Sequence, residues 1–223
     1  TFPHMGEYWI ALETLVRELG ATPLVPARMT KNTRELGARH SPEFVCVPFK
    51  YNLGNFIEAL DAGATVIAQA GGGCRFGYYA EIQEAILRDL GYEFEMVSLT
   101  SSWSVSDFIA DFRRVAPGVS TVRIARAFAI AYRKGKALEA VEDHVRKNVG
   151  FESEKGAHDR VVARFLRELR SADGFRSVGR LEEATLGELA ALPVDKPERP
   201  LRVGVVGELY ILMEPFANHN LER

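Results

Sequence analysis

Two cysteines are the residues whose type and surroundings point most directly to chemistry. Cys46 lies in Phe44-Val-Cys-Val-Pro-Phe-Lys50, and Cys74 lies in Ala70-Gly-Gly-Gly-Cys-Arg-Phe-Gly-Tyr-Tyr79. In both runs a short apolar segment, which we expect to be a strand, gives way to a loop that opens a helix. Ligands of open α/β folds bind at the carboxyl edge of the parallel sheet. The sequence therefore predicts that both thiols emerge at one such edge.

The residues beside each thiol favour a negatively charged ligand. Glycines remove side chains before Cys74, so backbone N–H groups can approach a bulky group. The helix expected from about Tyr78 adds positive potential that favours a thiolate, and a lysine or arginine adds a cation beside each sulfur. This pattern is typical of an iron–sulfur cluster held by thiolates. The predicted metal ligands are Cys46 and Cys74, and the predicted cofactor-binding residues are Lys50, Gly71, Gly72, Gly73 and Arg75.

Two other interpretations of the same residues stay open. Free cysteine is among the residues most often buried, so Cys46 and Cys74 could be core residues beside a glycine turn. A cysteine nucleophile would need a histidine base, and His4 could reach the same sheet edge from the first loop. Two further histidines, His144 and His158, are expected to face solvent.

The elements that would position these residues follow from hydrophobic periodicity. Strands alternating with helices over about the first 100 residues indicate an α/β fold with a parallel sheet flanked by helices, a Rossmann-like arrangement. From 105 to 192 the period is helical almost throughout, and Thr185-Leu-Gly-Glu188 matches a capping box. We expect strands at 22–26, 44–47, 65–70, 94–99 and 201–207, and early helices at about 7–19, 30–36, 55–62 and 79–90.

This pattern predicts three parts of the chain. Residues 1–104 form an α/β domain with both cysteines, 105–195 a helical insertion, and 196–223 the start of a second, truncated α/β domain. Both ends read as interior segments, so we expect a strand before Thr1 and a continuation of the second α/β unit after Arg223.

Composition indicates a globular protein. A chain of 223 residues with 47% hydrophobic content can bury the core of one or two domains. The formal net charge of -2, with both signs interspersed, gives no electrostatic case for a nucleic-acid or membrane partner. The apolar stretches are far shorter than the roughly 20 residues that span a bilayer, and no signal peptide is evident. Together with only two cysteines, these features predict a cytoplasmic location.

Several segments together resemble the superfamily of 2-hydroxyacyl-CoA dehydratases and benzoyl-CoA reductases. The nearest branch is the one labelled CoA-substrate-specific enzyme activase, or activator of 2-hydroxyglutaryl-CoA dehydratase. The similar segments cover both α/β portions of the chain: Phe2-Pro-His-Met-Gly6, Ser41 to Lys50, Leu53 to Glu58, Gly73 to Tyr79, Val205 to Tyr210 and Glu214 to Asn220.

The resemblance implies an oxygen-sensitive 4Fe-4S or related cluster bound through Cys46 and Cys74. It also implies an actin-like-fold ATPase as partner, fused or separate, which supplies an electron at low potential for reduction of an acyl-CoA thioester. Family members usually add a third cysteine from the second α/β unit, and this chain ends before one appears. The expected function is therefore iron–sulfur electron transfer within a CoA-ester dehydratase or reductase system, with a homodimer among the possible assemblies. The alternative is a non-catalytic α/β binding or scaffold module of an activase-type complex.

Overall fold

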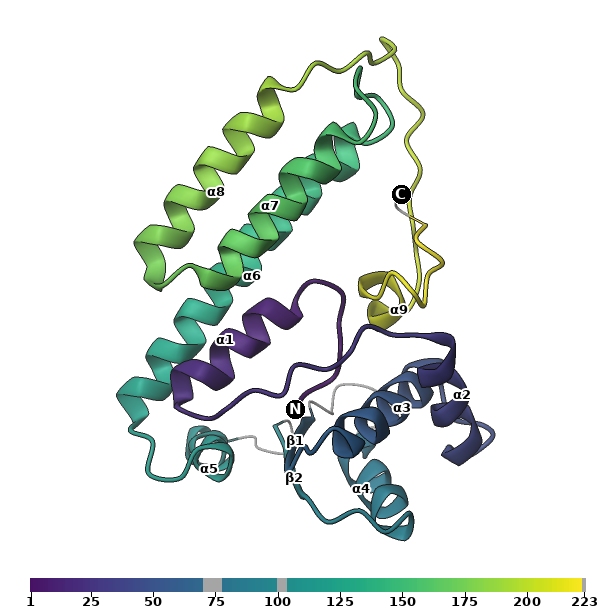
Figure 1. The fold of residues 1–223 in the computed structure, drawn as a ribbon, viewed down its shortest axis with the longest axis vertical. Coiled ribbons are helices and arrows are strands. Elements are labelled where there is room, and N and C mark those ends of the chain that lie inside the picture. Colours follow the sequence, from purple (N-terminus) through teal and green to yellow (C-terminus); the bar gives the residue numbers. More distant parts are fainter. Residues whose placement is uncertain (70–77, 100–103, 222–223) are drawn as a thin grey trace. The chain divides into compact units, whose positions relative to one another are not determined.

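A computed structural model describes residues 1–69, 78–99 and 104–221 of the chain (Figure 1). The chain forms two compact units, Thr1–Ala127 and Phe128–Arg223, which we call unit 1 and unit 2 and describe separately. The boundary between them lies inside a long helix, α6 (Thr121–Asn148). The predicted division into parts at 104/105 and 195/196 stays a prediction.

Unit 1 contains a parallel pair of strands, which gives it α/β character. Strands β1 (Val66–Gln69) and β2 (Glu95–Ser98) pair in the register Val66↔Glu95 to Gln69↔Ser98. On the other side of β1, the Thr1 amine donates to the Val66 carbonyl (2.6 Å), and the Ala68 N–H donates to the Thr1 carbonyl (2.9 Å). The strands predicted near these two segments are confirmed over 66–69 and 95–98.

Each predicted helix of unit 1 is present, but the helix predicted at 55–62 already begins at Val47, and the helix predicted at 30–36 extends to His40. The first helix ends where Gly20 adopts a left-handed conformation (φ 95°), which glycine tolerates without a steric penalty. The second begins with a capping box in which the side chains of Thr30 and Thr33 bond reciprocally to backbone N–H groups. The helices are α1 (Trp9–Leu19), α2 (Lys31–His40), α3 (Val47–Asp61), α4 (Tyr79–Asp89) and α5 (Val105–Val115).

Helices α2 and α3 form a tight hairpin beside the sheet. A Cβ built on Gly37 would lie 1.6 Å from the Lys50 carbonyl oxygen, and one built on Gly54 would lie 1.9 Å from the Thr33 carbonyl oxygen. The backbones touch, so only glycine fits at these two positions. The contact fixes the start of α3, because Lys50 lies in its first turn.

The core of unit 1 lies between α3, α4 and the strands. Burial of apolar side chains from these three elements supplies most of the driving force for their packing. The most buried residues of this core include Phe49, Leu53, Phe56, Ile67, Leu87 and Met96.

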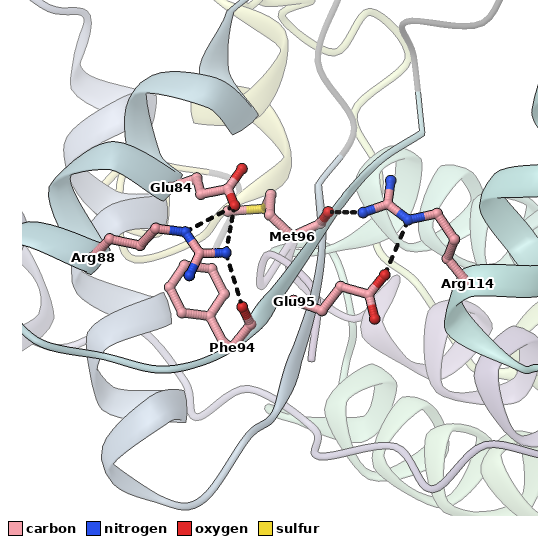
Figure 2. A network of polar contacts seen from close by, with 6 residues as sticks. All are labelled: Glu84, Arg88, Phe94, Glu95, Met96 and Arg114. Carbon is pink, nitrogen blue, oxygen red and sulfur yellow. Dashed lines mark hydrogen bonds and ion pairs between the residues drawn. The ribbon is translucent and has the colours of Figure 1, made fainter.

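Two arginines hold β2 between α4 and α5 (Figure 2). Arg88 of α4 donates to Glu84 (2.7 Å) and to the Phe94 carbonyl (3.2 Å). Arg114 of α5 donates to Glu95 (3.0 Å) and to the Met96 carbonyl (2.8 Å). The Met96 bond occupies a carbonyl on the side of β2 away from β1, and such capping protects an edge strand from unwanted pairing.

Three predicted strands are wrong. Residues 44–46 form a turn, and α3 begins at Val47 because Pro48 is favoured in the first turn of a helix. Residues 22–26 are irregular, since Pro23 and Pro26 cannot donate to a ladder. Residues 201–207 are not a strand either, and Val206 is 96% exposed. An apolar run becomes a strand only when a neighbouring edge pairs with it, and no described strand does so here.

Unit 2 is helical, as predicted for most of its length. The C-terminal part of α6, α7 (Ala157–Ser171) and α8 (Gly174–Ala191) run side by side, and a short α9 (Leu209–Met213) follows an extended segment (Figure 1). The predicted capping box at Thr185 is wrong, because Thr185 lies buried inside α8. The main apolar residues of this core are Ile130, Leu138, Val141, Phe165, Leu169, Val178 and Leu189.

Among the described residues, none of the helices combines the length and the apolar character that crossing a bilayer requires.

Candidate functional site

Cys46 is the N-cap residue of α3. Its backbone is extended (φ -65°, ψ 157°), and its side chain caps no backbone N–H group. The half-buried thiol therefore stays available for other contacts at the positive end of a helix of 15 residues. The sulfur contacts the Tyr79 hydroxyl within hydrogen-bonding distance.

Tyr79 brings a second helix N-terminus to the same place. It is the first residue of α4, and its ring packs edge-on against Phe49, with centroids 5.3 Å apart and an interplanar angle of 83°. Because Phe49 lies in the first turn of α3, the starts of α3 and α4 are fixed against each other beside Cys46. The Tyr79 side chain thus joins the start of α4 to the Cys46 sulfur.

A buried amide network connects this corner to the sheet. Gln69, the last residue of β1, donates to the Gln83 side chain of α4 (2.7 Å), and Gln83 donates to the Phe49 carbonyl of α3 (3.4 Å). Both glutamines are at most 1% exposed. Gln83 thus links the last residue of β1 to the first turn of α3.

Sequence reasoning missed both glutamines and Tyr79. A glutamine that ends an otherwise apolar strand was an available signal, since buried amides need partners. No sequence signal indicated that Tyr79 would reach Cys46.

The structure gives Lys50 a specific partner. Its ammonium group donates to the Glu43 carbonyl (3.2 Å), which ties the first turn of α3 to the loop before Cys46. Lys50 lies one turn after Cys46 along α3, so the cation belongs to the same corner of unit 1. The other predicted site residues, Gly71, Gly72, Gly73, Cys74 and Arg75, lie outside the described residues.

His4, the base proposed for a cysteine nucleophile, is buried at 5% exposure. Its backbone N–H donates to the Asn55 side chain (3.1 Å), and the Asn55 amide donates to the Ala27 carbonyl (3.2 Å). Asn55 thus ties two loops to α3. The hypothesis of a cysteine nucleophile with His4 as its base stays a prediction.

The prediction that His144 and His158 face solvent is wrong for His158, which is 1% exposed. Its ring lies beside that of His144, which is half-buried. A histidine just after a helix start gave no sequence signal of burial.

The corner at Cys46 suits a thiolate that binds an anionic, sulfur-rich group. Thiolate ligation is supported by groups such as a phenolic hydroxyl, a nearby ammonium and a helix N-terminus. Within residues 1–69, 78–99 and 104–221, no three metal-binding side chains come together.

Comparisons with protein-family models, with curated proteins and with solved structures gave no match.

Proposed function

We propose that this protein is an iron–sulfur electron-transfer protein related to the subunits of 2-hydroxyacyl-CoA dehydratases and benzoyl-CoA reductases. It would act in the low-potential, ATP-dependent reduction of an acyl-CoA or similar substrate. The observation that carries the proposal is the position of Cys46. Its thiol lies at the start of α3 and against the first residue of α4.

The residues of this corner have complementary roles under the proposal. Cys46 and Cys74 hold the cluster, which when bound supplies one-electron transfer at a potential set by nearby charge and hydrogen bonds. The Tyr79 hydroxyl, which lies within hydrogen-bonding distance of the Cys46 sulfur, would donate to the thiolate. Lys50 contributes positive charge, and the Gln69–Gln83 network keeps the two helix starts in place.

The finer parts of the proposal concern the surroundings of this corner. We propose a Rossmann-like arrangement around the β1–β2 pair and a cytoplasmic location. The partner would be an ATPase of the actin-like fold, on the same or another chain, and a second copy of this chain is a further candidate partner. These parts rest on the sequence resemblance and on the parallel pairing of β1 with β2.

Metal analysis of protein purified without oxygen tests the proposal. After anaerobic reconstitution with iron and sulfide, we expect equal amounts of iron and acid-labile sulfide and a broad absorbance near about 400 nm. Cys46→Ser and Cys74→Ser should each lose most of the iron. Tyr78→Phe is the matched control, because Tyr78 is 69% exposed and adjoins the same helix start.

A colourless, sulfide-free protein after reconstitution would contradict the proposal. Loss of both cysteines without any change in iron content would contradict it as well. Either result would favour the alternative of a non-catalytic binding or scaffold module.

A further inference from the structure

A second polar cluster lies inside unit 2, where α6 ends and α7 begins. The buried ring of His158 lies 6.4 Å from that of His144, measured between centroids. The Glu152 carboxylate faces His158, with Oε2 3.4 Å from Nδ1, a distance that becomes an ion pair when the ring is protonated. Neither ring nitrogen of His158 has a hydrogen bond of ordinary geometry to a described residue. The site thus holds a buried ring whose interactions depend on a proton.

The same place ties down the segment that follows α8. The Ser153 N–H donates to the Pro193 carbonyl (3.0 Å), and the Asp195 N–H donates to the Phe151 carbonyl (2.7 Å). Glu152 lies between these two bonds in a short antiparallel bridge. We call the two hydrogen bonds the clasp.

The groups around His144 disfavour its charged form. Burial lowers the pKa of His144 first, and the neighbouring His158 lowers it further. The Leu189 carbonyl, which accepts a hydrogen bond from the His144 ring, acts in the opposite direction. Lys196 lowers this pKa and Asp143 raises it, both by smaller amounts.

The Glu152 carboxyl group favours its ionised form. Desolvation raises the pKa of this group, but hydrogen bonds from the backbone N–H groups of Glu152 and Gly150, together with His158, outweigh this and lower the pKa overall. A proton on His144 adds a cation beside the His158 ring and close to Lys196.

We propose that the clasp is a proton-operated latch, in which protonation of His144 beside the buried His158 ring breaks the two hydrogen bonds and releases the segment after α8. Lys196 directly follows Asp195, so moving this cation away from the charged His144 ring removes the Asp195 bond. Because folding lowers the pKa of His144, the clasped state is most stable above about pH 6.5, the value for unfolded histidine. Its stability falls as the pH drops from there towards the lowered pKa.

Amide hydrogen exchange of Ser153 and Asp195 tests the latch. After correction for intrinsic exchange, we expect protection of these two amides to fall by up to about tenfold per pH unit between about pH 6.5 and pH 5. His144→Gln, which cannot be protonated, should keep the protection nearly constant. His40→Gln, at the end of α2 in unit 1, is the control and should retain the pH response.

The wild-type protein provides a second measurement in case His144→Gln does not fold. An NMR titration of the His144 ring should show an inflection at the pH where protection of the clasp is lost. Separate pH values for the two events, or a full pH response in folded His144→Gln, would overturn the proposal. Disappearance of the response with EDTA would also overturn it, because it would assign the histidines to a metal ion.

Discussion

At the scale of single residues, the Cys46 corner depends on polar groups that satisfy one another inside unit 1. The Gln69–Gln83 pair joins β1 to α4, and Gln83 also reaches the Phe49 carbonyl at the start of α3. A buried amide without a partner is costly, whereas removal of both partners is less so. This network therefore determines how firmly the helix starts are held beside the thiol.

A double-mutant cycle measures that network. Gln69→Leu and Gln83→Leu should each lower the free energy of unfolding by about 1–3 kcal/mol, because each leaves a buried amide unpaired. The double variant should lose clearly less than the sum of the two, since no unpaired side-chain amide remains. Denaturant unfolding gives the three values. Simple additivity would mean that the two side chains do not depend on each other.

The sequence identified some of these residues and not others. Cys46 was expected before a loop that leads into a helix at 55–62, whereas α3 already begins at Val47. The contact with Tyr79 could not be predicted, because it joins residues 33 positions apart on two helices whose packing the sequence does not specify. Burial of His158 was missed for the same reason, as its neighbours come from other elements.

At the scale of elements, the α2–α3 hairpin positions the site. Its helices approach so closely that Gly37 and Gly54 face backbone carbonyl groups directly. Helix α3 can begin at Cys46 in its observed place only while this contact is kept.

Alanine substitutions test the hairpin. Gly37→Ala and Gly54→Ala should each destabilise the protein by about 1–3 kcal/mol or more, because the added methyl group forces the helices apart. Gly135→Ala is the matched control, since this glycine also lies inside a helix but has open space around its Cβ position. The control should raise stability by about 0.5–1 kcal/mol through the loss of chain entropy in the unfolded state. Equal effects at Gly37 and Gly135 would show that the close approach is not maintained in solution.

The periodicity of apolar residues and the capping residues predicted those elements that depend only on neighbouring residues in the sequence. The helix ending at Gly20, the strands at 65–70 and 94–99 and the long helical stretch after residue 105 were all identified correctly in type. The strands predicted at 44–47 and 201–207 were wrong, because a run of valine and phenylalanine suits a strand, a helix start or an extended segment equally well. The choice depends on whether another strand lies beside it, which is a property of the fold and not of the run.

At the scale of the whole molecule, the two proposed sites belong to different units. The Cys46 corner belongs to unit 1, and the histidine cluster with its clasp belongs to unit 2. Each therefore has its own test. Iron content reports on the first, and amide exchange at Ser153 and Asp195 reports on the second.

The central claim is that Cys46 and Cys74 lie close enough to bind one inorganic group. A short reagent that alkylates two thiols at once, applied to the metal-free folded protein, tests this directly when followed by mass spectrometry. We expect a single cross-link between the peptides that contain Cys46 and Cys74. It should form within one chain and be lost on unfolding. Separate modification of the two thiols, without a cross-link, would contradict the central claim.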